Sequence, residues 1–227
     1  MIRTLPRTAV FLLMAAASLP AADWTPLFDG KTLNGWEPVG ECKWMVTGEG
    51  YLFGRRPVPN GKEPFGPWPV AQKAYRSWFS EQAWLYTTRN DFTSYDLHLE
   101  FWLQEGGNSG VSLFDSSRGG KSFGPGKIET PAHIGYEIQL LGSDEGEYIT
   151  GAIYTLQRAK TGLQRLNSWN TLDIETRPDM IRVKVNGKVA AEHAPDPARP
   201  KTGPIGLQLH DRSTWVMFRN IKIRELK

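Results

Sequence analysis

The chain has 227 residues, 40% of them hydrophobic, which is enough for one all-β domain of the larger kind with a substantial core. Its 27 basic and 24 acidic residues leave a formal net charge of only +3, which argues against a nucleic-acid-binding surface. Cys42 is the only cysteine, so an internal disulfide is excluded and packing must stabilise the fold.

Residues 1–22 have the pattern of a secretory signal peptide. Arg3 and Arg7 precede an apolar run over residues 9–19, and the small residues Ala21 and Ala22 follow it. The run is too short for a stable membrane anchor, and no later segment is long and apolar enough to span a bilayer. We expect an exported protein, periplasmic or extracellular, in which residues 23–227 form one domain. Removing the two arginines lowers its net charge from +3 to +1.

Short apolar or alternating segments separated by turn signals recur along the chain and predict an all-β sandwich. The expected strands are Trp44–Thr47, Tyr51–Phe53, Trp84–Thr87, Tyr95–Leu103, Gly110–Phe114, Gly135–Leu141, Ala152–Leu156, Asn170–Thr176, Met180–Val185, Lys188–Glu192, Pro204–Leu209 and Val216–Glu225. Asn186-Gly187 predicts a two-residue type I′ hairpin turn, because both residues readily adopt positive φ.

Two stretches interrupt this pattern of strands. Residues 55–81 are rich in proline and aromatic residues and suggest a packed flap, with a short helix expected at Ala71–Gln82. Residues 118–133 are rich in glycine and lysine and lead directly into the strand that begins at Gly135. Loops of this length in a compact domain are usually functional or disordered.

The strand Gly135–Leu140 places a carboxyl group and an amide on one face. Side chains alternate across a strand, so Tyr136, Ile138 and Leu140 are expected to face the core, and Glu137 and Gln139 a ligand or solvent. Two other strands show a similar alternation, with polar positions His98, Glu100, Gln208 and His210 and the aromatic residue Trp102 opposite the core face. We expect these three strands to share one polar face.

Seven motifs follow one another in an order that resembles the 3-keto-disaccharide hydrolase family, also described as 3-keto-glucoside lyase and 3-keto-2-hydroxyglucal hydratase. They are Leu27–Trp36, Gly107–Val111, Gly135–Gln139, Thr150–Tyr154, Trp169–Asn170, Gly203–Gln208 and Phe218–Ile221. The resemblance covers nearly all of residues 23–227 and implies a concanavalin A-like jelly roll with a sugar-binding face. Residues 55–81 are longer than the family pattern, and Leu209 and Arg212-Ser213-Thr214 replace its acidic and glycine-rich residues around His210.

The resemblance implies a sugar already oxidised at C3. A ketone there acidifies the C2 proton, so a single base can form an enolate that expels the C1 substituent, and water then adds to the double bond. Glu137 is the first candidate for the base and His210 the second; their structural alternatives are a sugar-hydroxyl acceptor and a surface histidine. No nicotinamide-binding glycine loop is present, so an upstream sugar 3-dehydrogenase would have to supply the substrate.

Candidate substrate-binding residues surround these two. Gln139, Gln208 and Asn108 offer amide groups that can bind sugar hydroxyls or an enolate oxygen, although Asn108 also suits a tight turn. Glu100, on the expected polar face, is a further candidate. Among the aromatic residues, Trp102, Trp169, Trp215 and Tyr154 can stack against a pyranose ring, but aromatic side chains of a sandwich are more often core.

Two other functions compete with this interpretation. A conventional glycosidase of the same fold carries carboxylates in an E-x-D-x-x-E pattern on one strand, and this chain has Gln139 and Gly142 at the second and third places. A noncatalytic carbohydrate-binding module needs only amides and aromatic residues, so Glu137 and His210 favour the enzyme.

The sequence specifies no cofactor with confidence. The acidic turn Asp144, Glu145 and Glu147 has oxygen ligands of the kind that calcium prefers, but a solvated loop is the better interpretation. His98, His133 and His210 are scattered, and no metal-ligand spacing connects them.

Overall fold

The computed structural model describes residues 23–57, 82–119 and 134–226. The predicted signal peptide, the helix predicted at Ala71–Gln82 and most of the two loop-like stretches lie outside these residues. The described part of the chain contains no helix long and apolar enough to cross a membrane.

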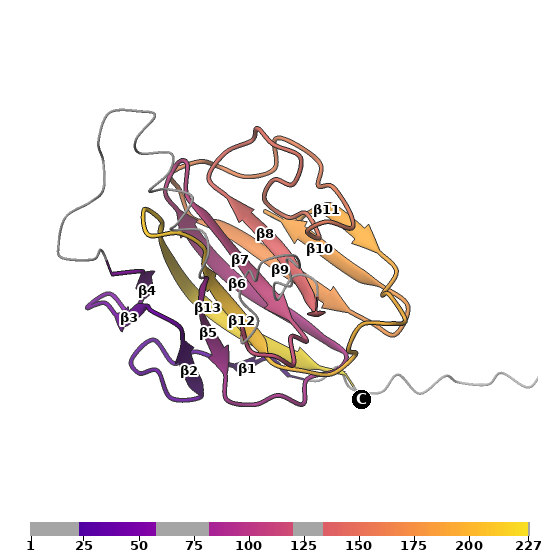
Figure 1. The fold of residues 1–227 in the computed structure, drawn as a ribbon, viewed down its shortest axis with the longest axis horizontal. Helices are drawn as coiled ribbons and strands as arrows, with labels where there is room; N and C mark the ends of the chain where they lie inside the picture. The colour runs from indigo at the N-terminus through magenta and orange to yellow at the C-terminus, as the bar shows by residue number, and fades with distance from the viewer. Residues whose placement is uncertain (1–22, 58–81, 120–133, 227) are drawn as a thin grey trace, which may run out of the picture.

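The described strands form two antiparallel sheets, which confirms the predicted β-sandwich. The larger sheet has the order β11-β10-β9-β6-β13-β4-β3, with β1 paired to β13 (Figure 1). Its strands are β1 (Thr25–Pro26), β3 (Lys43–Val46), β4 (Leu52–Arg55), β6 (Tyr95–Leu103), β9 (Asn170–Thr176), β10 (Ile181–Val185), β11 (Lys188–His193) and β13 (Trp215–Glu225).

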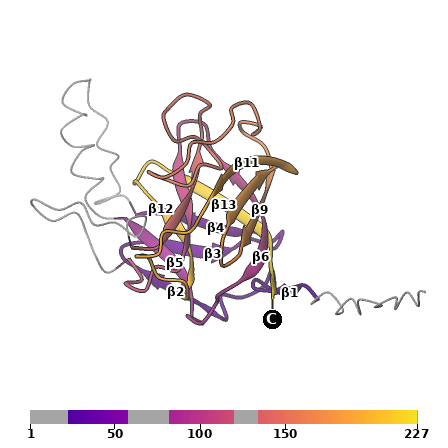
Figure 2. The same cartoon turned by 90° about the vertical axis from the view of Figure 1, so that its right-hand side faces the viewer.

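The smaller sheet carries the candidate site and has the order β2-β5-β12-β7-β8. Its strands are β2 (Trp36–Val39), β5 (Ala83–Thr87), β7 (Asn108–Leu113), β8 (Tyr136–Leu141) and β12 (Ile205–Leu209). Figure 2 shows the sandwich turned on its side, with β12, β5 and β2 in one layer and β9, β6 and β13 in the other.

Alternation along the strands produces a single apolar core between the sheets. Leu97, Leu99 and Phe101 of β6 face it from the larger sheet, and Ile138 and Leu207 from the smaller one. Each of these side chains is at most 1% exposed. Burying a large aliphatic or aromatic side chain contributes about 1.5–3 kcal/mol, so this layer supplies the packing that a fold without an internal disulfide requires.

The hairpin between β10 and β11 forms as predicted. Val185 pairs with Lys188, and the two residues between them, Asn186 and Gly187, have φ angles of 51° and 77°. These positive angles match the twist of the flanking strands in a type I′ turn.

Three local predictions differ from the structure. The strand predicted at Ala152–Leu156 is instead a turn with isolated bridges, because Thr155 has a φ of 64° and the chain folds back so that Ile153 and Gln157 exchange backbone hydrogen bonds. β1 and β2 were not predicted. β1 has only two residues, and Pro38 lies within β2, where it is tolerated because β2 lies at the sheet edge.

The expectation that three strands share one polar face is wrong for β6. Its alternation is as predicted, but β6 belongs to the larger sheet, whereas β8 and β12 belong to the smaller one. Since the core-facing side chains of both sheets meet between the layers, His98, Glu100 and Trp102 lie on the opposite outer surface from Glu137.

Candidate functional site

The candidate site lies on the outer face of the smaller sheet, around Glu137. Tyr136, Ile138 and Leu140 of β8 enter the core, so Glu137 and Gln139 project from the other side. Glu137 is only 4% exposed and Gln139 only 5%, although neither belongs to the apolar core. The sequence thus places two buried polar groups side by side outside the core.

A glycine on β7 makes room for the Glu137 side chain. Gly110 pairs with Gln139, and a Cβ added at Gly110 would lie 2.6 Å from Oε1 and 2.9 Å from Cγ of Glu137. The carboxyl group therefore lies across the β7 backbone, in the direction of β12. Within the described residues, Gln208 of β12 is the polar side chain that interacts with it.

The surroundings of Glu137 strengthen it as a base. Burial raises the pKa of its carboxyl group to about 8, because the charged form is poorly solvated, and the Gln208 amide opposes this rise only in part. The group is mainly protonated at pH 7, and its carboxylate form is a stronger base than an exposed glutamate.

Gln208 is a buried amide suited to binding a ligand. It is fully buried, and among the described residues neither its Nε2 nor its Oε1 has a hydrogen-bond partner of normal geometry. The Oγ of Ser112, on the outward face of β7, is likewise buried without a hydrogen-bond partner of normal geometry among the described residues. A buried polar group without a partner costs about 1–3 kcal/mol, so such groups usually receive a ligand or water.

A chain of contacts connects Gln139 to His210. Nε2 of Gln139 donates to Oδ1 of Asn108 (3.1 Å), and the Asn108 backbone N–H donates to Oγ1 of Thr214 (2.9 Å). The Thr214 hydroxyl donates to Oδ1 of Asp211 (3.0 Å), whose Oδ2 lies 3.6 Å from Nδ1 of His210. The structure thus joins three residues predicted from sequence through two that were not predicted.

Asp211 is charged and organises the loop after β12. Burial raises its pKa, but hydrogen bonds from His210, Ser213 and Thr214 outweigh this effect, and the net pKa is lowered. Oδ1 accepts from the backbone N–H groups of Ser213 (2.9 Å) and Thr214 (2.8 Å). The residues that depart from the family pattern around His210 therefore build a defined loop.

Tyr154 also lies beside Glu137. Its backbone N–H donates to the Glu137 carbonyl (2.8 Å), and its half-buried ring packs edge-on against Tyr148 with centroids 5.2 Å apart. Burial, followed by the charge of Glu137, raises the pKa of its hydroxyl. Both interactions place Tyr154 near Glu137.

Glu100 and Trp169 do not join this site, and their predicted grouping with Glu137 is wrong. Glu100 accepts a hydrogen bond from Arg219 (2.8 Å) and another from Asn220 on the outer face of the larger sheet. The Trp169 ring is covered by the Arg219 guanidinium group, 4.1 Å from its centroid, and contacts Trp102 edge-on. These contacts stabilise the opposite surface of the sandwich.

Residues of β5 complete the site face and were missed as functional candidates. Trp84 pairs with Gln208 and Tyr86 pairs with Gly206, so both side chains project outward beside β12. All five residues of β5 are buried, and its sequence Ala-Trp-Leu-Tyr-Thr has no clear polar alternation. The only available signal was the period of two itself, which places Trp84 and Tyr86 opposite the core residues Ala83 and Leu85.

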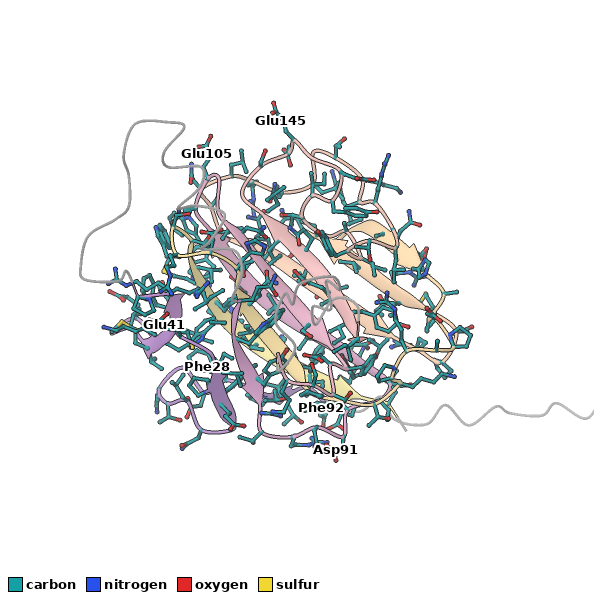
Figure 3. The ribbon with its side chains drawn as sticks, viewed as in Figure 1. Phe28, Glu41, Asp91, Phe92, Glu105 and Glu145 are labelled. Atoms are coloured by element: carbon teal, nitrogen blue, oxygen red, sulfur yellow. The ribbon has the colours of Figure 1, made fainter. Side chains whose placement is uncertain are left out.

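The residues proposed for calcium do not form a site. Glu147 is paired with Arg158 (2.6 Å), Asp144 accepts from Gln164 (3.0 Å), and Figure 3 shows Glu145 projecting away from the molecule. Within the described ranges, no group of three or more His, Cys, Asp or Glu side chains is arranged to hold a metal ion.

Two surface cavities lie away from Glu137. One, of about 340 Å³, is lined by residues that include Asp29, Tyr51 and Arg219. The other, of about 220 Å³, is mainly apolar and is lined by residues that include Tyr136 and Ile181. Neither cavity lining combines an acid or base with a buried amide such as Gln208, so the outer face of the smaller sheet is the better candidate.

Replacing Gly110 with alanine tests whether the position of the Glu137 carboxyl group matters. The new methyl group would collide with Oε1 and Cγ of Glu137 and push the side chain away from Gln208. We expect turnover to fall at least tenfold and stability to fall by about 1–3 kcal/mol. Steady-state kinetics and thermal unfolding measure the two effects, and Gly48→Ala, where a Cβ meets open space and φ is not positive, controls for the cost of a non-glycine residue.

Solved structures similar to this chain share its fold. Two proteins from Parabacteroides distasonis ATCC 8503, described as candidate glycosyl hydrolases, align with TM-scores of 0.65 and 0.63. They are 19% and 23% identical, and the alignments cover 90% of this chain in both cases and 94% and 100% of those proteins. A Bacillus subtilis protein of unknown function with a galectin-like fold has a TM-score of 0.58 at 11% identity, with 90% of this chain and 96% of that one covered. These likenesses confirm the jelly-roll architecture.

The sequence also matches a family model over residues 23–224, which is nearly the whole of the described domain. No curated protein matches the chain. The family is described as the 3-keto-alpha-glucoside-1,2-lyase-like domain, in agreement with the resemblance found in the ordered motifs. This chain belongs to the family of 3-keto-alpha-glucoside-1,2-lyase-like domains.

Proposed function

We propose that this protein cleaves 3-keto-glycosides by proton abstraction, elimination and hydration, with net hydrolysis of the glycosidic bond. The observation that carries the proposal is Glu137, a buried carboxyl group with a raised pKa that lies beside the fully buried Gln208 amide on the face opposite the core. Family membership supports the same chemistry.

In this reaction the Glu137 carboxylate removes the proton from C2 of the sugar, and the electrons pass toward the C3 ketone to form an enolate. The Gln208 amide is a suitable donor to the enolate oxygen, since N–H donors placed where charge develops stabilise the transition state. The C1–O bond then breaks, the leaving group takes up a proton, and water adds across the C1=C2 bond. His210, beside Asp211, provides the second proton-transfer group.

Asp115 and Asp211 are further buried carboxylates of the smaller sheet and its loops, and their hydrogen bonds favour a mechanism in which Glu137 is the single carboxylate base. Asp115 accepts hydrogen bonds from Tyr86, Ser117 and Gly119, and Asp211 is bound by its own loop. A retaining or inverting glycosidase needs two carboxyl groups placed across the scissile bond, one of them available as nucleophile or base. Within the described residues, both of these carboxylates are thus already engaged in structural hydrogen bonds.

Aglycone release from paired substrates tests this function. The purified protein is incubated with a glucoside and with its 3-keto derivative, and we expect release only from the keto sugar. Release from the unoxidised glucoside would support a conventional glycosidase. Binding of either sugar without turnover would support a carbohydrate-binding module instead.

We also propose that the protein is exported, to the periplasm or the exterior, and that a separate sugar 3-dehydrogenase supplies its substrate. The basic and apolar pattern of residues 1–22 supports export, and the chemistry supports the second step because elimination requires a ketone at C3. N-terminal sequencing of the protein from extracytoplasmic fractions should find a start near residue 23, and a start at Met1 would contradict export.

A further inference from the structure

A second buried polar pair lies on the same face as Glu137. Tyr86 and Asp115 are both fully buried, and the Tyr86 hydroxyl donates to Oδ2 of Asp115 at 2.6 Å. Asp115 also accepts from the Ser117 hydroxyl (2.6 Å) and the Gly119 backbone N–H (2.8 Å), both within its own turn. These turn contacts fix the carboxylate, which in turn fixes the direction of the Tyr86 hydroxyl.

The strand register places Tyr86 in one row with Glu137. Glu137 pairs with Ser112, Ser112 with Gly206, and Gly206 with Tyr86, across the four strands β8, β7, β12 and β5. A Cβ at Gly206 would lie 2.5 Å from Cε1 of Tyr86, so the ring occupies the space that a side chain there would need. The glycine lets the Tyr86 ring lie across β12, as Gly110 lets Glu137 lie across β7.

Electrostatic coupling agrees with this placement. Burial, followed by the negative charge of Asp115 and its hydrogen bond, raises the pKa of Tyr86 well above its usual range, and the charge of Glu137 adds to the effect. Ser112, between the two in the row, interacts with the Tyr86 hydroxyl. Tyr86 is therefore a neutral phenol throughout the pH range of the reaction and is too weak an acid to protonate a leaving group.

We propose that Tyr86 is a specificity-determining residue that accepts a hydrogen bond from a hydroxyl group of the bound sugar, and that Asp115 is the residue that positions it. The phenolic proton is directed to Asp115, so the Tyr86 oxygen can only accept a further hydrogen bond, a role in which a sugar hydroxyl would compete with Ser112. A sugar hydroxyl can donate to this oxygen, whereas a ketone cannot. Tyr86 thus selects a hydroxyl and leaves the carbonyl to the Gln208 amide; this assignment rests on the proposed sugar substrate.

Deoxy analogues of the substrate test this contact. We expect one among the 4-deoxy and 6-deoxy 3-keto-glucosides to lose about 10- to 100-fold in kcat/KM with the wild-type protein, because a buried acceptor is left unpaired. Tyr86→Phe should lose a similar factor on the parent sugar and show no further loss on that analogue. Asp115→Asn, whose amide can donate to the phenol and reverse its orientation, should weaken the same discrimination.

Tyr51→Phe is the matched control, because Tyr51 packs against Trp169 on the opposite surface and should leave all ratios unchanged. Equal losses on every sugar with Tyr86→Phe would overturn the proposal, as would wild-type kcat/KM values within threefold across both analogues. The wild-type comparison needs no variant, so it decides the question even if Tyr86→Phe folds poorly.

If the wild-type protein turns over no keto sugar, the proposed reaction fails, and the Tyr86 contact is then judged by binding. Calorimetric titration uses methyl glucoside and its 4-deoxy and 6-deoxy analogues. The wild-type protein should bind one analogue more weakly than methyl glucoside, whereas Tyr86→Phe should bind that analogue and methyl glucoside with equal affinity. No binding of any of these sugars would overturn the contact as well.

Discussion

Replacing Glu137 with glutamine is expected to lower kcat for a 3-keto-glucoside by about 10²- to 10⁴-fold, the range typical of removing a general base. Glutamine has nearly the same shape, so it can lie across Gly110 and beside Gln208 as Glu137 does. It cannot accept the C2 proton, however. Since binding contacts are largely retained, KM should change much less than kcat, and aglycone release under steady-state conditions measures both constants.

Glu100→Gln is the matched control for this experiment. It makes the same chemical change on the outer face of the larger sheet, where Glu100 binds Arg219 and Asn220. We expect it to retain kcat within about threefold, because the site and Glu100 lie on opposite surfaces of the sandwich. Equal losses in both variants would indicate a general effect of destabilisation, and full activity of Glu137→Gln would remove Glu137 from the catalytic role.

The pH dependence of stability should also report on Glu137. Its pKa is about 8 in the folded protein and near the ordinary value of 4.5 in the unfolded chain. Between these values the folded state binds the proton more tightly, so this contribution is complete below pH 4.5 and is lost as the pH rises toward 8. Each unit of pKa difference corresponds to about 1.4 kcal/mol, so the loss should amount to several kcal/mol.

Urea unfolding of the wild-type protein and of Glu137→Gln across pH 4.5–9 isolates this contribution, because the other titrating groups cancel in the difference. The free energy of unfolding of the wild-type protein minus that of Glu137→Gln should fall as the pH rises. A difference that does not change with pH would contradict the burial of an ionisable Glu137. Over the same interval kcat/KM should rise toward a plateau above pH 8, since the base must be ionised in the free enzyme.

We therefore expect activity and stability to respond to pH in opposite directions through one group. The site retains a carboxyl group where its charge is poorly solvated, with only an amide beside it among the described residues. This arrangement costs folding stability at alkaline pH and produces a stronger base. Such an exchange of stability for reactivity is common where buried groups perform chemistry.

Much of the fold could be predicted from local pattern. The alternation in β6 and β8 and the Asn186-Gly187 turn each depend on residues close in sequence, and all three were confirmed. The turn at residues 152–157 was mistaken for a strand, because an apolar run does not reveal the positive φ of Thr155. β2 was missed because Pro38 suppresses the strand signal and is tolerated only at a sheet edge.

The sequence by itself determined that this chain forms a β-sandwich, belongs to its family, and carries Glu137 and Gln139 on a face opposite the core. A period of two and an ordered set of motifs are enough for these conclusions. Only the tertiary structure decided which polar faces coincide. Side-chain alternation assigns a residue to one face of its own strand, whereas the order of strands in the two sheets decides that Gln208 and Tyr86 join Glu137 and that Glu100 lies on the opposite surface.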